Sequence, residues 1–162
     1  MLLMMLPGIT GDSIVEGFVG WISLGSVQFG VGRGVSSAGV GMKDRDTSTP
    51  SISEVVVTKM TDITSTLLFA EATYGDALDN CIIALVQTGG KDAPVQEYWR
   101  ITLTKPILSG WSLSSGGDRP SESISINFNK IVMKYTQFTD GGDPKVADPK
   151  GYDLTTGKPA SA

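Results

Sequence analysis

Three glycines near the start of the chain are the first residues whose spacing suggests chemistry. Gly30, Gly32 and Gly34 resemble part of a dinucleotide-binding loop, in which glycines let the backbone approach a pyrophosphate. That fingerprint needs a further glycine where Val35 stands and should open a helix, but no helical pattern follows. The better interpretation is a glycine-rich strand end that enters a loop.

A second short motif, Gly89-Gly90-Lys91, is similar to the end of a phosphate-binding loop. The glycine required five residues before Gly90 is missing, because Leu85 is there. Asp92 stands where serine or threonine should follow the lysine. A hairpin turn therefore explains these residues better than a nucleotide site.

Catalytic and metal-binding side chains are scarce. The chain has no histidine, which is the usual general base near neutral pH and the commonest metal ligand. Cys81 is the only cysteine, and its place in the apolar run 81–86 predicts a buried, inert thiol. Ser13 has neither a histidine partner nor the surroundings of a nucleophile elbow. We therefore expect no enzymatic activity, no metal and no cofactor.

A mixed-charge cluster stands apart from these residues. Asp44 and Asp46 flank Arg45, and Lys43 lies beside them. Calcium binding is disfavoured, because further oxygen ligands are missing and the two basic side chains would repel a cation. Two interpretations stay open, which are a docking patch for a partner with complementary charges and a solvated loop.

Composition and length indicate an ordinary single domain. The 162 residues fit one domain, residues 1–162, and 40% of them are apolar, which is enough for a core. The net charge of −4 gives no basic surface for nucleic acid. The apolar start, residues 1–6, is too short and too neutral for a signal peptide, and no run approaches the roughly 20 apolar residues of a membrane span. We expect no nucleic-acid binding, no cleaved signal peptide and no membrane insertion.

The dominant pattern in the elements is a period of two, typical of half-buried strands. Apolar residues alternate with polar ones over 99–104 and again over 124–128. The apolar set then moves out of phase, to Ile131, Met133 and Tyr135, which predicts a bulge or sharp bend near Asn129 and Lys130. Further strands are expected at the N-terminus and over 20–31, 53–60, 80–87 and 108–114. The sequence predicts a mainly β fold, a small barrel or two packed antiparallel sheets.

One segment, residues 62–74, has a helical pattern instead. Asp62 is a plausible N-cap, and apolar residues recur at Ile63, Leu67, Ala70 and Tyr74. Gly75 follows as a residue free to adopt a positive φ. We predict one helix of about three turns at the side of the sheets.

Two segments lack a clear pattern. The loop 33–50 is longer than a compact domain usually tolerates without a reason, so we expect it either to be disordered or to be ordered by a partner. The tail 139–162 is rich in glycine, proline and charge, with Tyr152 and Leu154 as its only large apolar residues. We expect weak order there.

Several short stretches, in this order and spacing, resemble the Hcp family, the tube protein of the bacterial type VI secretion system. They are residues 8–13 (GITGDS), 20–24 (GWISL), 53–62 (SEVVVTKMTD), 120–128 (PSESISINF) and 151–154 (GYDL), which together span nearly the whole chain. The resemblance implies a small β-barrel with one helix, six-membered rings and stacked rings that form a hollow tube. It also implies partners: other copies of the chain, effectors carried in the lumen, and the sheath and tip proteins. By the same resemblance the protein stays in the bacterial cytoplasm before firing and is then secreted, outside the cell or into a target cell.

The resemblance also suggests where two kinds of site lie. Ser26 and Gln28 share one face of their strand, opposite Val27 and Phe29, and their strand is similar to the pore-lining strand of the family. They are therefore candidates for the lumen, unless they simply face outside solvent. Met42, Lys43, Asp44, Arg45 and Asp46 are candidates for contacts with the neighbouring ring.

Two other classes of protein are open alternatives. A monomeric β-barrel binding module, for example a carbohydrate binder, should expose aromatic residues clustered in loops, whereas Trp21, Trp99 and Trp111 all lie in strand-like runs. A hydrolase is disfavoured by the missing histidine. The size of the particle in solution distinguishes these classes from a ring.

Overall fold

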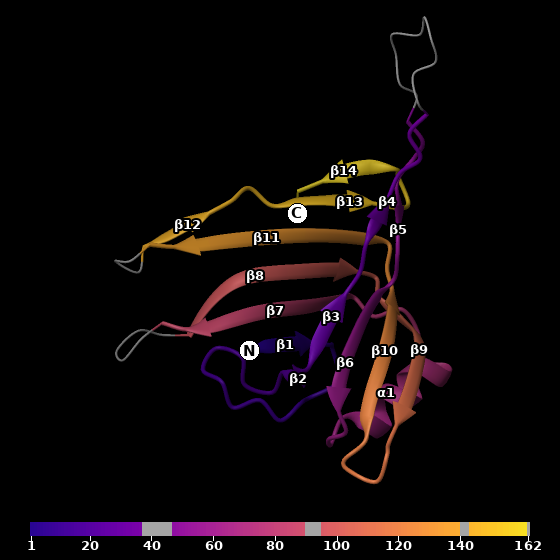
Figure 1. Ribbon diagram of the computed structural model, residues 1–162, viewed down its shortest axis with the longest axis vertical. Coiled ribbons are helices and arrows are strands. Elements are labelled where there is room, and N and C mark those ends of the chain that lie inside the picture. The colour runs from indigo at the N-terminus through magenta and orange to yellow at the C-terminus, as the bar shows by residue number, and fades with distance from the viewer. Residues whose placement is uncertain (37–46, 90–94, 140–142, 162) are drawn as a thin grey trace, which may run out of the picture.

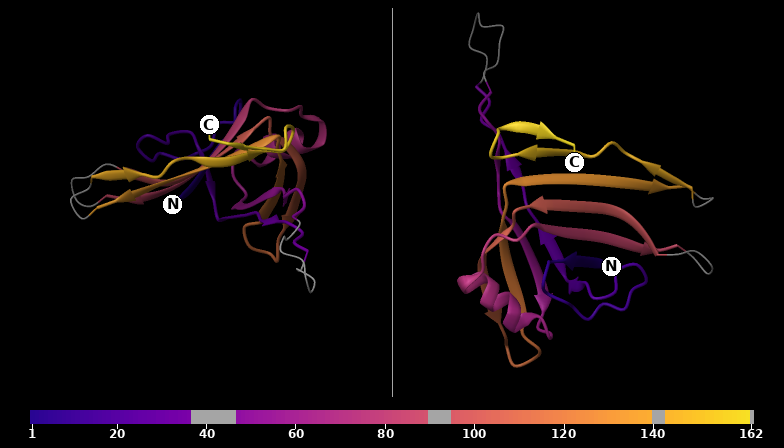
Figure 2. Two further views of the ribbon diagram at one scale, coloured as in Figure 1. Left: turned by 90° about the horizontal axis from the view of Figure 1, so that it is seen from above. Right: turned by 180° about the vertical axis from the view of Figure 1, so that it is seen from behind.

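The computed structural model describes residues 1–36, 47–89, 95–139 and 143–161, and within them it has two main antiparallel sheets, whose strands run in crossed directions, and a separate two-stranded sheet. Figure 1 shows the strands of the larger sheet running across the view and those of the smaller sheet running along the long axis. Seen from above, the larger sheet extends to one side well beyond the smaller one (Figure 2). The candidate loop residues Met42, Lys43, Asp44, Arg45 and Asp46 lie outside the described residues.

The larger sheet contains eight strands. Their spatial order is β14 (Lys158–Ala160), β13 (Lys150–Asp153), β11 (Lys130–Phe138), β8 (Val95–Thr104), β7 (Asn80–Thr88), β1 (Leu2–Met5) and β2 (Ile22–Leu24), with β12 (Pro144–Val146) pairing with β11. The smaller sheet has the order β3 (Ser26–Gln28), β6 (Val55–Met60), β10 (Ser121–Asn127) and β9 (Ile107–Ser114). This arrangement confirms the mainly β fold of two packed antiparallel sheets.

The core lies between the two sheets and is built from alternate residues of their strands. The larger sheet contributes Met4, Ile83, Ile101 and Leu103, and the smaller sheet contributes Val55, Val57, Ile124 and Ile126. All eight are buried. Because strand side chains alternate between faces, the same strands present a second set of residues on the side away from the core.

The bend expected near Asn129 is confirmed. β10 ends at Asn127 in the smaller sheet and β11 begins at Lys130 in the larger one, so the chain changes sheets between them. This change of sheet is why the apolar set moves out of phase there. One strand was expected over 20–31, but this segment forms three strands, β2, β3 and β4 (Val31–Gly32), each in a different sheet.

The helix α1 (Ser65–Tyr74) begins three residues later than expected. Asp62 is not its N-cap; its carboxylate accepts hydrogen bonds from the amide and hydroxyl of Thr64 at 2.8 and 2.6 Å, in a turn that leads into the helix. Gly75 has a negative φ of −73°, so the expectation of a positive φ was wrong. A glycine is needed there for space, because a Cβ would lie 2.6 Å from the carbonyl oxygen of Glu71.

The buried face of the helix is narrow. Leu68 is the one fully buried residue of α1, whereas Leu67 and Tyr74 are exposed, as is Ile63 before the helix. The helix packs on β9 through Phe69, whose ring meets that of Trp111 edge-on at 5.3 Å. The apolar spacing therefore predicted a helix correctly, although the residues that carry this spacing do not form its buried side.

The tail expected to be weakly ordered contains β12, β13 and β14. β13 pairs with β11, and Gly151 fits only because it has no side chain, since a Cβ would lie 2.2 Å from the carbonyl oxygen of Ile131. Composition missed these strands because their main contribution is backbone pairing and not apolar burial.

The described parts of the loop 33–50 are also regular. β4 pairs with β5 (Ser51–Ile52), and a bridge joins Val35 to Thr47 further out. The amide of Gly34 donates to Ser48 Oγ at 2.8 Å. The two arms form a narrow ribbon that extends from one end of the molecule along its long axis (Figure 1).

Candidate functional site: an uncharged polar face on the smaller sheet

The side of the smaller sheet that faces away from the core is covered with short polar side chains. Residues paired on neighbouring strands project to the same side, so strand register assembles them into rows. Three rows cross the sheet: Ser26–Thr58–Ser123–Ser112, Gln28–Val56–Ser125–Gly110 and Met60–Ser121–Ser114. Most of these side chains are hydroxyls, so this polar face can both donate and accept hydrogen bonds.

Strict alternation produces the polar face. In β10, Ser121, Ser123 and Ser125 lie on it, whereas the intervening Glu122, Ile124 and Ile126 are buried. In β6, Val55 and Val57 are buried while Thr58 lies on the face. Each strand therefore supplies the core with one half of its residues and the polar face with the other.

The polar face carries no charge from its own strands. Among all residues of β3, β6, β9 and β10, only Lys59 and Glu122 are charged, and both are directed into the interior. They are paired across β6 and β10, in register. At the rim, Glu54 precedes β6 and its carboxylate accepts a hydrogen bond from Asn127 Nδ2 at 3.2 Å.

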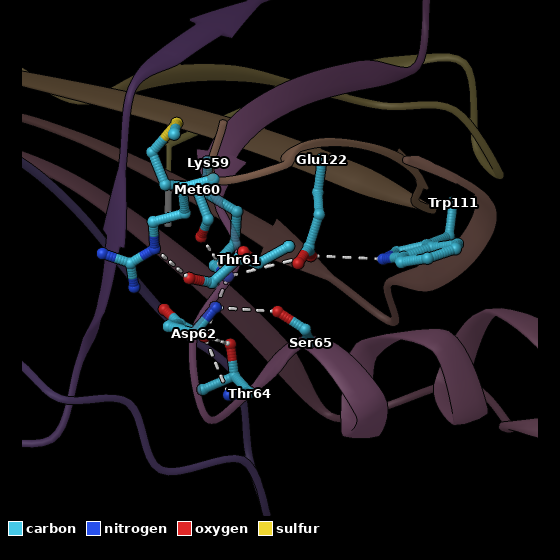
Figure 3. Close-up of polar contacts among 9 residues, drawn as sticks. Lys59, Met60, Thr61, Asp62, Thr64, Ser65, Trp111 and Glu122 are labelled. Atoms are coloured by element: carbon cyan, nitrogen blue, oxygen red, sulfur yellow. Dashed lines mark hydrogen bonds and ion pairs between the residues drawn. The ribbon is translucent and has the colours of Figure 1, made fainter. Parts of the chain in front are cut away.

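Beneath the polar face, the two inward charges belong to a buried polar cluster (Figure 3). Lys59 Nζ lies 2.8 Å from Asp62 Oδ1 and 3.7 Å from Glu122 Oε2, and it donates to the carbonyl oxygen of Met60 at 2.9 Å. Trp111 Nε1 donates to Glu122 Oε2 at 3.2 Å. The side chains of Lys59 and Glu122 have no exposed surface.

This cluster joins three strands of the smaller sheet to the entrance of the helix. Burial alone would raise the pKa of Asp62, but the hydrogen bonds from Lys59 and Thr64 outweigh it and hold that pKa below its ordinary value. Asp62 therefore stays ionised beside the lysine. Since Lys59, Glu122 and Trp111 come from β6, β10 and β9, their contacts fix these strands relative to one another beneath the polar face.

Both predicted face residues lie on the polar face. Ser26 and Gln28 are exposed and Val27, between them, packs against the core, as the alternation predicted. Ser26 Oγ and Thr58 Oγ1 are 2.6 Å apart. Gln28 borders a hollow of about 540 Å³ together with Phe29, Ser53, Glu54 and Val56.

Sequence reasoning missed the larger part of the polar face. Thr58, Ser112, Ser121, Ser123 and Ser125 were not assigned to it, although the repeated serines of β10 were a visible signal. Periodicity shows which residues of one strand share a side. It does not show which sides of distant strands meet, because that depends on how the strands pair.

Both edges of the smaller sheet are open. β3 forms one edge and β9 the other, and no strand in the described part of the chain pairs with their outer sides. An open strand edge presents unpaired amides and carbonyls that can pair with another chain.

The single cysteine, Cys81, lies in the core on β7 of the larger sheet. Burial raises the pKa of the Cys81 thiol to about 12, which leaves it almost entirely protonated near neutral pH. In the described ranges there is no group of three or more histidine, cysteine or acidic residues that could hold a metal ion. What the face offers is an extended, uncharged, hydrogen-bonding surface.

Comparison with known families gives a match over residues 3–135 to the family described as "Type VI secretion system effector, Hcp". The chain belongs to the Hcp family. Comparison with curated protein sequences gives no match.

Solved Hcp structures share the fold of this chain. A structure described as a type six secretion system protein superimposes with a TM-score of 0.87 at 22% identity and covers 98% of both chains. Hcp1 from Salmonella typhimurium gives a TM-score of 0.72 at 20% identity, over 98% of this chain and 97% of that one. A type VI secretion system effector from Yersinia pestis gives 0.69 at 20% identity, over 94% and 99%.

No helix in the described residues is both long enough and apolar enough to cross a membrane.

Proposed function

We propose that this Hcp-family chain is a structural tube protein, in which six copies close into a ring and rings stack into a hollow tube. The polar face of the smaller sheet lines the channel, and Ser26 and Gln28 contact effectors carried inside it. The chain is held in the bacterial cytoplasm until a sheath contracts, and the tube is then expelled with its tip. This role requires no enzymatic activity, cofactor or nucleic acid.

The observation that carries the proposal is an uncharged polar face on a sheet with two open edges. If β3 of one copy lies beside β9 of the next, the face becomes continuous around a ring. Six four-stranded sheets with strands about 4.8 Å apart would close into a barrel about 115 Å around and about 37 Å across between backbones, before strand tilt widens it. Such a channel has room for polypeptide.

Stacking is supported by the ribbon of β4 and β5. It extends along the long axis, in the direction of the strands of the smaller sheet, and so along the axis of the proposed tube (Figure 1). Met42, Lys43, Asp44, Arg45 and Asp46 lie between its two arms in sequence, which suits them to contact the neighbouring ring.

The alternative, a monomeric carbohydrate-binding module, has less support. Trp21 packs against a small apolar cluster, and Trp111 is hydrogen-bonded to Glu122. Trp99 lies on the larger sheet against Tyr135, at 5.7 Å between ring centres. The three tryptophans therefore do not form a shared platform for a sugar.

The mass of the particle in solution tests the proposal. Six copies of the 17.1 kDa chain should give a particle of about 103 kDa by native mass spectrometry and light scattering. A stable monomer at tens of micromolar would overturn the ring and leave the monomeric alternative.

A further inference from the structure

The helix α1 leaves apolar side chains in water that an isolated domain would normally cover. Leu67, Phe69 and Tyr74 are exposed, and Tyr74 is 79% exposed. Ile63, at the entrance to the helix, is 76% exposed. Only Leu68 is fully buried, so this helix presents an apolar surface outward.

Beside the end of this helix there is a hollow of about 420 Å³. The helix lines one wall, and the turn at Gly8 and Ile9 and the segment 75–78 line the others. Its apolar lining includes Ile9, Leu67, Ala70, Tyr74 and Leu78. A small aliphatic projection would fill such a hollow well.

The loop between β1 and β2 provides an aliphatic projection of this kind. Ile14 is 91% exposed and Val19 is 72% exposed. The loop is braced, because the amide of Gly11 donates to the carbonyl of Gly20 at 2.7 Å and the amide of Gly20 donates to the carbonyl of Ser13 at 2.8 Å. These backbone hydrogen bonds fix the loop, so its two exposed aliphatic side chains need little ordering when they bind a partner.

The start of the β1–β2 connection, at Gly8 and Ile9, lines the hollow, and the rest of the connection leads away from α1 to the other side of the molecule, at the same end of its long axis. Figure 1 shows α1 on one side and the β1–β2 loop on the other, and the view from behind in Figure 2 agrees. The helix packs on the edge strand β9, through Phe69 and Trp111. The loop leads through β2 into the other edge strand, β3.

We propose that Ile14 and Val19 of one copy occupy the hollow beside α1 of the next copy. The inference rests on the proposed ring and specifies which surfaces close it. When β3 of one copy lies beside β9 of its neighbour, the β1–β2 loop of the first copy is brought next to α1 of the neighbour, because α1 packs on β9. The contact is head-to-tail, so every copy uses both surfaces once, and the contacts close when the rotation between copies is that of the proposed six-membered ring.

The charges around the two surfaces indicate that apolar contact drives this docking. Asp12 and Glu16 belong to the loop, while Glu71 and Asp76 border the hollow, so the nearby charges have the same sign. Salt screens such repulsion. Rings should therefore persist in about 1 M salt, where interfaces that depend on opposite charges weaken.

Disulfide cross-linking tests the contact directly. The native Cys81 is fully buried, so engineered thiols react without competition from it. The double variant Ile14→Cys with Tyr74→Cys should give, on mild oxidation, a ladder of covalent species up to the full ring. Each single variant alone should stay a covalent monomer, and a mixture of the two single variants should give covalent dimers.

The outcomes separate this inference from the proposed ring. Particles with the mass of a ring that give no ladder would overturn the docking surfaces and leave the ring intact. A monomeric particle would overturn both. Covalent dimers from either single variant alone would show a symmetric contact and would also overturn the inference.

A substitution series gives an independent measurement. Ile14→Asp should raise the protein concentration needed for half-assembly by about tenfold or more, because it places a charge in an apolar hollow. Val35→Asp is the control, since Val35 is also an exposed aliphatic residue but belongs to the ribbon, and it should leave the ring mass unchanged. Equal assembly of Ile14→Asp and the wild type would contradict the proposed contact.

Discussion

At the scale of single residues, the position of Lys59 shows how the polar face is kept neutral. Its strand turns Thr58 and Met60 toward the face and Lys59 toward the interior, directly opposite Glu122 on β10. A buried lysine needs compensation, and Asp62, Glu122 and the carbonyl of Met60 provide it. Alternation predicted the exposure of Ser26 and Gln28, but only strand pairing reveals that Lys59 and Glu122 meet.

The cluster predicts a large loss of stability for Lys59→Met. Removing the ammonium leaves two carboxylates without their counter-ion, one of them fully buried, and should reduce the free energy of unfolding by about 3–5 kcal/mol. Urea unfolding at a fixed protein concentration measures this change in the free energy of unfolding. Lys105→Met is the matched control, because the pair of Lys105 with Asp79 is exposed, and it should leave the unfolding midpoint unchanged. Equal midpoints for both variants would show that the buried pair contributes nothing.

At the scale of elements, strands were predictable and the helix was only partly so. The strands β6, β7 and β9 were expected within two residues of their bounds, because alternation is a strong signal when one face is buried. The helix has apolar residues on several sides, so periodicity could not select Leu68 as the inward residue. The strands of the tail were missed, because β12 and β14 have mostly exposed side chains and are held by backbone pairing.

The polar face predicts a specific effect of Gln28→Arg. The side chain is exposed, so the change should leave the unfolding midpoint and the ring mass unchanged. It places bulk and positive charge on an otherwise uncharged surface, and should reduce the amount of effector that co-purifies with the ring.

The matched control is Gln87→Arg, because Gln87 is also an exposed glutamine and lies near the end of β7 in the larger sheet. It should leave effector retention unchanged. Unchanged retention in Gln28→Arg as well would place Gln28 on an outer wall, and the channel would have to be sought on another sheet.

At the scale of the whole molecule, three kinds of surface are open and available to the proposed assembly. They are the two edges of the smaller sheet, the apolar surfaces at α1 and the β1–β2 loop, and the ribbon at one end of the long axis. The family was predictable from short ordered stretches, and the match over residues 3–135 confirms it. The position of the surfaces was not predictable, since it depends on which strands end at an edge.

The ribbon predicts that charge reversal will separate stacking from ring formation. Lys43→Glu with Arg45→Glu should give intact rings that no longer form tubes in electron micrographs. Each exposed ion pair is worth only about 0–1 kcal/mol, but a ring repeats it in every copy.

The exchange Lys43→Arg with Arg45→Lys keeps both charges and serves as the control, in which tubes should persist. High salt should loosen stacks of wild-type rings while the rings themselves survive. If the charge-reversed variant forms tubes normally, residues 42–46 do not make the proposed contact with the neighbouring ring.

The crossed strands of the two sheets have a mechanical consequence. Along a strand the load is carried by covalent bonds, whereas across a sheet it is carried by hydrogen bonds, which yield more easily. The smaller sheet has its covalent direction along the long axis and the larger sheet has it across that axis (Figure 1). In the proposed tube, each copy would therefore resist both stretching along the tube and spreading around it with covalent chain.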